Sequence, residues 1–256
     1  MHPYEINVLG DSFLFFSFES EKRLDEALVL GKRCVILLPS LLADFRVIGY
    51  ESNKKELYDY YSAAICAAAH LTEKRGLPLS DLSFETPNGI IEIFHTGVGL
   101  FTVNINKCKV LLSKSVELCA CRLDACDVFV NGIFRVVGAS SAKRFDDKLL
   151  PRLAGADFPL PCAAVVCSSE RGRISLKRYS DYNPTPPSSV LTYAAAAYKE
   201  YAFLRRKESD AYFCFDDGSS CHVSRRGIEM TVKAKFVTEK NEFTGLAHLA
   251  VTENDS

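Results

Sequence analysis

The hydrophobic pattern of residues 62–71 predicts a buried helix in the first half of the chain. This stretch is rich in alanine, and its apolar side chains are spread around every face of the helical wheel. A helix that is apolar on all faces is usually buried inside a protein. Gly76 predicts the end of the helix because glycine tolerates a positive φ, and Pro78 cannot continue it.

The residues that follow this helix alternate between apolar and polar types and predict a β-hairpin. The alternation runs over residues 82–86, and a returning strand is expected over residues 90–94. Asn88-Gly89 lies between them and is a preferred pair for a type I′ turn. The pattern therefore predicts a central helix that packs against a sheet.

The same pattern returns in the second half of the chain. Residues 190–206 predict a second Ala-rich helix, and Asp217-Gly218 follows it at the place that Asn88-Gly89 takes in the first half. We interpret this as a two-fold internal repeat, in which each unit consists of strands around one buried helix. The alternative is a chance similarity between two Ala-rich helices.

Further strands and one surface helix complete the expected elements. The charged residues 21–33 predict a short surface helix, and Gly10-Asp11-Ser12 interrupts the first strand with polar groups that are expected to face a cleft. The other strands are expected over residues 6–18, 34–38, 45–50, 98–112, 128–137, 163–167, 173–179 and 227–238.

The composition narrows the classes of protein that this chain can belong to. Its 256 residues are enough for two domains of ordinary size. With 31 basic and 32 acidic residues the formal charge is −1, which argues against a nucleic acid as the main partner. The one dense basic run, 205–207, follows a predicted helix and suits the C-terminal end of its dipole.

The sequence predicts a cytoplasmic protein without bound metal. Its N-terminus lacks a basic leader, and no apolar stretch is long enough to span a membrane. The ten cysteines are therefore expected to be reduced and mostly buried. Cys119, Cys121 and Cys126 could suggest zinc, but Cys-x-Cys is too close for the usual zinc ligand pair and no histidine lies near.

Several segments, in order and in spacing, resemble those of diaminopimelate epimerase and its racemase relatives. They are LGDSF, SAAICAAAHLTEKRGL, ETPNG, VNGIF, FPLPCAAVV, ISLKRYSDY and EMTVKAKFV. The resemblance implies an α/β (α+β) fold with two pseudo-symmetric domains. Each domain would be a curled, mostly antiparallel sheet around a central buried helix, and both helix N-termini would face one interdomain cleft.

The repeat and the resemblance together predict the domain boundaries. Residues 1–112 with residues 233–245 are expected to form the first domain, and residues 113–232 the second. The last residues, 246–256, are expected to form a loose tail.

The resemblance also identifies the positions of the family's chemistry. The family uses two cysteines, one at the start of each central helix, to move a proton between the two faces of an amino acid without a cofactor. Tyr60 and Ser189 occupy these positions here, and Cys66 matches a second, noncatalytic cysteine. Neither a tyrosine nor a serine hydroxyl is a ready base at neutral pH. The simpler interpretation of Ser189 is a cap of the second helix.

The positions that contact the substrate in this family are also altered. Asn131 is retained, whereas Asp11, Glu51 and Ala163 replace the other asparagines. The glycines that let a carboxylate approach the backbone are replaced by larger residues, which are Tyr61, Ala63, Val190 and Thr192. The resemblance therefore leaves the following candidates for ligand binding: Asp11, Glu51, Tyr61, Ser62, Asn131 and Asp181.

These observations favour a pseudoenzyme that keeps the scaffold and has lost the pair of bases. Its cleft could bind a small anionic ligand, such as a carboxylate or an amino acid, or a protein partner, and the chain could form a homodimer. No cofactor is expected. The alternative is a cofactor-independent isomerase, epimerase or lyase that acts on an amino acid or related carboxylate with altered acid and base residues. A serine hydrolase elbow and a phosphate-binding glycine loop are both missing from the sequence.

Overall fold

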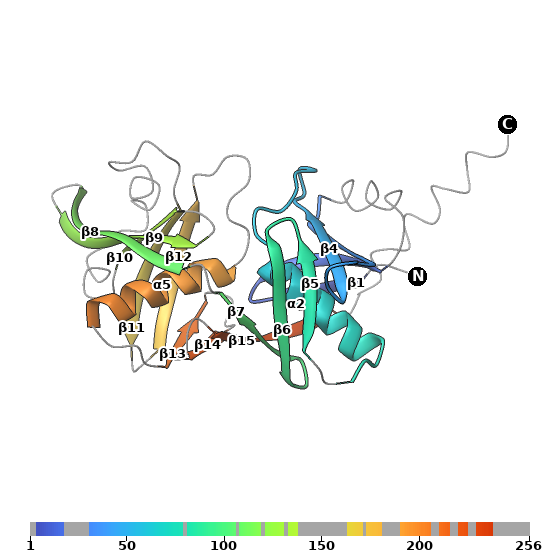
Figure 1. The fold of residues 1–256 in the computed structure, drawn as a ribbon. Helices are drawn as coiled ribbons and strands as arrows, with labels where there is room; N and C mark the ends of the chain where they lie inside the picture. Colours follow the sequence, from blue (N-terminus) through green and yellow to red (C-terminus); the bar gives the residue numbers. More distant parts are fainter. Residues whose placement is uncertain are drawn as a thin grey trace.

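The strands of the computed structural model follow one another in a single hydrogen-bonded order that curls into two halves (Figure 1). The structure describes residues 4–17, 31–78, 81–105, 108–118, 121–130, 133–137, 163–170, 173–180, 190–205, 210–215, 220–224 and 229–237. The first half contains β1 (Tyr4–Val8), β2 (Asp11–Ser17), β3 (Cys34–Leu38), β4 (Phe45–Tyr50), β5 (Leu82–Thr86), β6 (Gly89–Gly97) and β7 (Leu100–Asn104). The second half contains β8 (Cys108–Leu118), β9 (Cys121–Val130), β10 (Ile133–Val137), β11 (Ala163–Glu170), β12 (Arg173–Ser180), β13 (Ala211–Cys214), β14 (Ser220–Ser224) and β15 (Glu229–Val237).

The two halves meet at the antiparallel pair β7–β15 and repeat the same pairing pattern on either side of it. In the first half β2 pairs with β3 and β4 with β5 in parallel, and in the second half β10 pairs with β11 and β12 with β13 in parallel. The other pairs are antiparallel. The predicted fold of two pseudo-symmetric, mostly antiparallel units is therefore confirmed.

One long strand of the second half also completes the sheet of the first. The first part of β15 pairs with β7, and its last residues pair with β1. Thr102 of β7 and Thr231 of β15 are directly paired, and their hydroxyls lie 2.7 Å apart. These two threonines are 129 residues apart in the chain, which is also the separation of Asn88 and Asp217 in the predicted repeat.

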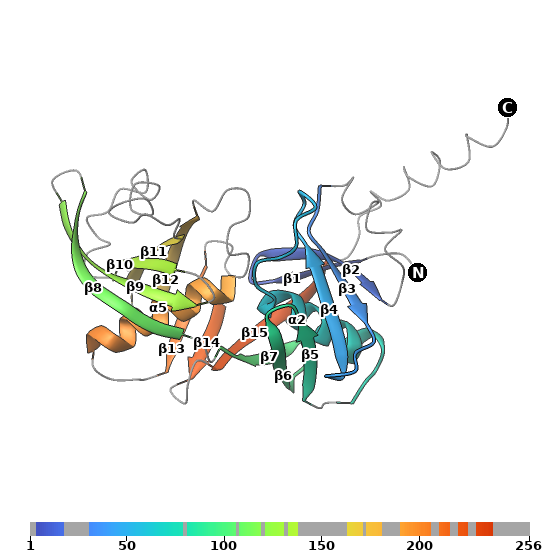
Figure 2. The same cartoon turned by 45° about the horizontal axis from the view of Figure 1, so that its top comes forward.

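Each half wraps its sheet around one helix, as Figures 1 and 2 show. Helix α2 (Tyr61–Ala69) is buried along its whole length and continues as a π-helix, η1 (His70–Lys74). Gly76 follows with a φ of 69°, which confirms the predicted end of the helix. The second helix is α5 (Val190–Arg205), and its first turns are equally buried. Buried apolar residues from both halves form one continuous cluster.

The hairpin after α2 differs from its predicted turn by one residue. Thr86 pairs with Gly89, so the two turn residues are Pro87 and Asn88 rather than Asn88 and Gly89. Proline favours the second position of a type I turn, and glycine favours the fourth. Gly89 has a φ of 115°, which an L side chain rarely adopts. The proline therefore sets the position of the turn.

The first predicted strand is also different, because it forms a hairpin instead of one interrupted strand. Strands β1 and β2 pair in antiparallel fashion around Leu9 and Gly10, whose φ angles are 54° and 86°. The Asn7 side chain accepts a hydrogen bond from the Gly10 amide at 3.0 Å and donates one to Ser12 Oγ at 2.9 Å. This turn places Asp11 at the start of β2.

Residues 113–118 and 121–127 belong to the paired strands β8 and β9. Of the cysteines whose side chains the structure describes, Cys34, Cys66, Cys126 and Cys221 are buried and Cys108 and Cys214 are half-buried, and these six are free thiols. The predicted surface helix lies mainly outside the described residues.

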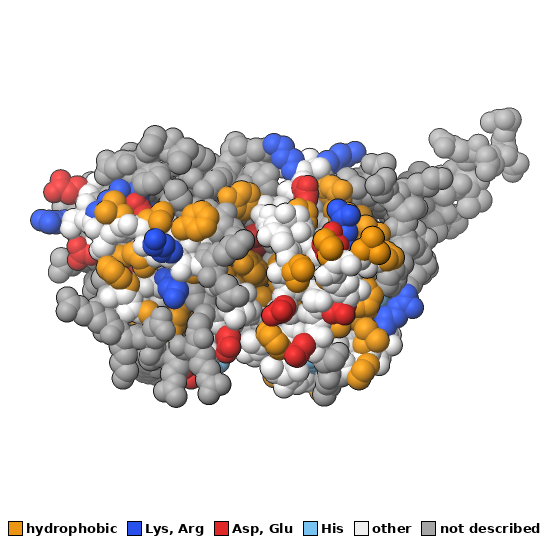
Figure 3. All heavy atoms as spheres, in the orientation of Figure 1, with side chains coloured by type: hydrophobic (Ala, Val, Ile, Leu, Met, Phe, Trp, Pro, Cys, Tyr) orange, Lys and Arg blue, Asp and Glu red, His pale blue; other side chains and the backbone are white. Residues whose placement is uncertain are grey.

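In the described part of the chain, no helix has the length and apolar character needed to cross a membrane. On the face in Figure 3, Lys and Arg side chains are interspersed with acidic and apolar ones.

Candidate functional site

Tyr60 is held in the interior directly before α2. Its side chain is 1% exposed, and its hydroxyl donates to Glu56 Oε1 at 2.9 Å and lies 3.4 Å from the Gly49 carbonyl oxygen. Burial raises the pKa of Tyr60 well above its ordinary value, and the hydrogen bond to Glu56 raises it further. Tyr60 is therefore neither ionised nor accessible to a substrate at neutral pH.

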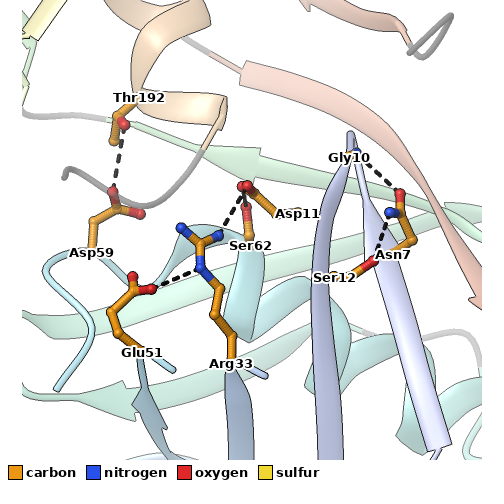
Figure 4. Close-up of polar contacts among 9 residues, drawn as sticks. All are labelled: Asn7, Gly10, Asp11, Ser12, Arg33, Glu51, Asp59, Ser62 and Thr192. Atoms are coloured by element: carbon orange, nitrogen blue, oxygen red, sulfur yellow. Dashed lines mark hydrogen bonds and ion pairs between the residues drawn. The ribbon is translucent and has the colours of Figure 1, made fainter. Parts of the chain in front are cut away.

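Three charged side chains gather beside the start of α2 (Figure 4). Arg33 Nε donates to Glu51 Oε2 at 2.8 Å, and Arg33 Nη1 lies 3.1 Å from Asp11 Oδ1. Both carboxylates are buried, whereas 22% of the Arg33 side chain remains exposed. Its guanidinium also lies over the Phe13 ring, 5.7 Å from the ring centre. We call Asp11, Arg33 and Glu51 the charged triad.

The charged triad is connected to the first turn of α2 through Ser62. Ser62 Oγ donates to Asp11 Oδ2 at 3.2 Å, and both residues are buried. The amino end of a helix carries a partial positive charge and favours a negative group. Asp11 therefore places one of the chain's own carboxylates where this end of α2 favours an anion.

The start of α5 contacts a carboxylate of the first half. Thr192 Oγ1 donates to Asp59 Oδ2 at 3.4 Å, and Thr192 and Asp59 are both buried. Asp59 comes from the segment just before α2, so this contact connects the two helix starts (Figure 4). The resemblance assigned Thr192 to the position of a family glycine, and in the structure its hydroxyl is bonded to Asp59.

We predict a modest loss of stability when this contact is removed. Thr192→Val keeps the shape of the side chain but takes one donor from the buried Asp59 carboxylate. The free energy of unfolding is expected to fall by about 1 to 2 kcal/mol in urea denaturation. Thr96→Val is the control, because Thr96 is exposed and its loss should cost less than about 0.5 kcal/mol. An equal effect of the two substitutions would contradict the assigned contact.

Glu51 differs from the other members of the charged triad in one respect. Its Oε2 atom binds Arg33, but its Oε1 atom is buried and has no hydrogen-bond partner in the described part of the chain. Burial raises the pKa of Glu51; Arg33 acts in the opposite direction, and Asp11 adds to the increase. An ionised carboxylate with an unbound buried oxygen is costly.

The structure thus brings together several of the predicted site residues and leaves others outside its description. Asp11, Glu51 and Ser62 lie in or beside the charged triad, and Tyr61 begins α2 next to them. The remaining predicted positions, Ser189, Asn131 and Asp181, lie outside the described residues. The described residues contain no group of His, Cys, Asp or Glu side chains arranged to hold a metal ion.

Arg33 and Asp59 were not identified from the sequence. Arg33 lies at the end of a charged stretch that was interpreted as a surface helix, and Asp59 lies between polar and aromatic residues. One signal was present for Arg33: the resemblance assigned two carboxylates, Asp11 and Glu51, to one site, and neighbouring carboxylates favour a cation between them. The sequence contained no comparable signal for Asp59.

Comparison with solved structures identifies the fold. A phenazine biosynthesis protein of the PhzF family from Enterococcus faecalis has a TM-score of 0.69 at 9% identity, covering 92% of this chain and 96% of that one. A hydroxyproline epimerase from Agrobacterium vitis has a TM-score of 0.66 at 10% identity, covering 92% and 90%. A probable proline racemase from Agrobacterium radiobacter has a TM-score of 0.64 at 12% identity, covering 96% and 94%.

These similarities concern the fold alone, because the identities are low. No protein-family model matches the sequence, and no curated protein matches it either. Membership in the diaminopimelate epimerase family itself stays a prediction. The chain has the two-unit fold that is shared by the PhzF-family protein, the epimerase and the racemase.

Proposed function

We propose that this chain is a noncatalytic member of the racemase and epimerase fold. The main support is the state of the first helix start. The resemblance assigns one proton-transfer group to position 60, where the Tyr60 hydroxyl is buried, bonded to Glu56 and shifted to a higher pKa. Such a group cannot remove a proton at neutral pH.

The arrangement of carboxylates supports the same proposal. In the family that the sequence resembles, the helix starts hold the substrate carboxylate. Here Asp11 contacts the first turn of α2 through Ser62, and Asp59 contacts the first turn of α5 through Thr192. A second carboxylate at either place would be repelled by the one already present. We therefore propose that the chain does not bind an amino acid in the catalytic manner.

Substitution of Tyr60 tests whether its hydroxyl has a chemical role. Tyr60→Phe removes the hydrogen bond to Glu56, and Glu56 is exposed enough to be solvated by water instead. We expect the free energy of unfolding to fall by about 1 kcal/mol in urea denaturation, with no change in any turnover of amino acids. A turnover that is present in the wild type and lost in Tyr60→Phe would contradict the proposal.

Restoring the cysteines is a stricter test of the same proposal. We expect that Tyr60→Cys with Ser189→Cys creates no racemase, because a thiol at the buried position 60 would resist ionisation and the glycines around it are replaced. The measurement is the optical rotation of an enantiopure amino acid over time, with diaminopimelate, proline and hydroxyproline as substrates. Racemisation by the double variant would show that the site needs only its two thiols.

One observation favours a second candidate function. Glu51 is a buried carboxyl with a raised pKa and one oxygen without a described partner, and these are properties of a general base. A cofactor-independent isomerase or lyase could use such a group on an amino acid or a small carboxylate. In that case Glu51→Gln would abolish a turnover that Tyr60→Phe leaves intact.

A further inference from the structure

The charged triad contains more negative than positive charge. Asp11 and Glu51 carry two carboxylates, and Arg33 is the one cation that contacts them among the described residues. Arg33 directs Nε to Glu51 and Nη1 to Asp11, so one guanidinium bridges the two carboxylates. An additional anion at this place would lie close to the two carboxylates and be repelled by them.

Glu51 Oε1 provides an independent observation, because it lacks a hydrogen-bond donor in the described part of the chain. Glu51 is only 6% exposed, and this oxygen is buried without a hydrogen-bond partner in the described residues. In Figure 4 it is turned away from Arg33, toward the side where Asp59 lies. Buried carboxylate oxygens are almost always paired with a donor. The geometry therefore calls for a hydrogen-bond donor, preferably one that carries a positive charge.

The charged triad can be reached from solvent on one side. Arg33 retains 22% of its side-chain exposure, and Glu51 is followed directly by exposed residues of the loop 52–56. A bulky cation would be less suitable, because the carboxylates themselves are buried.

From this geometry we infer that Glu51 and Asp11 form a binding site for the ammonium group of a small primary amine, with Glu51 Oε1 as its acceptor. The ammonium would donate one hydrogen bond to this oxygen and place a positive charge beside the Glu51 carboxylate. This inference rests on the proposed noncatalytic function, because it assigns these carboxylates to binding rather than to proton transfer. It replaces the expected anionic ligand by a cationic one.

Three small probes separate the features that the inference requires. Ethylammonium carries both the charge and the N–H donors, choline carries the charge without N–H donors, and propionate carries the opposite charge. Their dissociation constants for the wild-type protein are measured by ligand-observed NMR at constant ionic strength. We expect ethylammonium to bind at least about ten-fold more tightly than choline or propionate.

Two matched variants locate the site. Glu51→Gln keeps the size of the side chain and removes its charge, and it should weaken ethylammonium binding by at least about ten-fold. Glu85→Gln is the control, because Glu85 belongs to a different ion pair, with Arg46 at 3.9 Å, and should leave binding unchanged. Circular dichroism establishes that both variants are folded, and the comparison of probes on the wild type does not depend on any variant.

Several results would overturn the inference: equal binding of propionate, equal binding of choline, unchanged binding to Glu51→Gln, or no saturable binding of ethylammonium. Its failure can be told apart from a failure of the proposed function. Ethylammonium binding together with turnover of an amino acid would contradict only the noncatalytic proposal. Absence of both would contradict only the amine site.

Discussion

Arg33→Met is expected to lower the free energy of unfolding by about 3 to 5 kcal/mol, because it leaves two buried carboxylates without their described cation. The side chains of Asp11 and Glu51 are 5% and 8% exposed, so water cannot replace the guanidinium. Burial tends to lower the pKa of Arg33, but the two carboxylates outweigh it and the pKa is raised. The loss is measured by urea denaturation at pH 8.

Two comparisons separate this effect from a general loss of packing. Arg46→Met removes an arginine that is 47% exposed and lies 3.9 Å from Glu85, so it should cost less than about 1 kcal/mol. Adding Asp11→Asn and Glu51→Gln to Arg33→Met should recover most of the lost stability, since neutral side chains need no cation. If the triple variant is as unstable as Arg33→Met, then the charges are not the cause.

Glu200→Met is expected to stabilise the protein, and the gain should depend on pH. Glu200 lies on α5 with 3% exposure, and its Oε1 atom has no hydrogen-bond partner in the described residues. Burial raises its pKa from 4.5 to about 7. The folded state therefore holds the proton more tightly than the unfolded state, and ionisation of this buried group opposes folding as the pH rises.

The sign and the pH window follow from these two pKa values. Below pH 4.5 Glu200 is protonated in both states and costs nothing electrostatically. Between pH 4.5 and about 7 the wild type loses stability, and above that range the loss is complete. The difference in free energy of unfolding between Glu200→Met and wild type should increase by about 3 kcal/mol between pH 4 and pH 8.

An exposed glutamate provides the control for this titration. Glu92→Met replaces a solvent-exposed side chain on β6, and its effect should stay below about 0.5 kcal/mol at either pH. A constant difference between Glu200→Met and wild type across the whole range would mean that Glu200 is not protonated in the folded protein at neutral pH.

Much of the fold could be predicted from the sequence because its signals are local. The apolar helix, its end at Gly76 and the strands after it depend on neighbouring residues, and these were found with small errors. The turn at Pro87-Asn88 was misplaced because two local preferences compete there. The prediction of one interrupted strand was wrong. Leu9 adopts a positive φ although it is neither glycine nor asparagine, and the sequence around it does not indicate this.

The site could be predicted only in part, for a different physical reason. The resemblance identified Asp11 and Glu51, but the partner of both, Arg33, is brought in by the parallel pairing of β2 with β3. The contact between Asp59 and Thr192 joins residues of the two halves. Such contacts depend on how the chain folds over long distances, and local composition does not encode them.

The most direct test of the noncatalytic proposal is the incorporation of solvent deuterium at the α-carbon of amino acids. The wild-type protein is incubated in deuterium oxide with diaminopimelate, proline, hydroxyproline and the common amino acids, beside an active racemase as the positive control, and the products are analysed by mass spectrometry and NMR. The proposal predicts no label above the level without protein for any of them. Label at the α-carbon of a single amino acid, lost on Glu51→Gln or Tyr60→Phe, would contradict it.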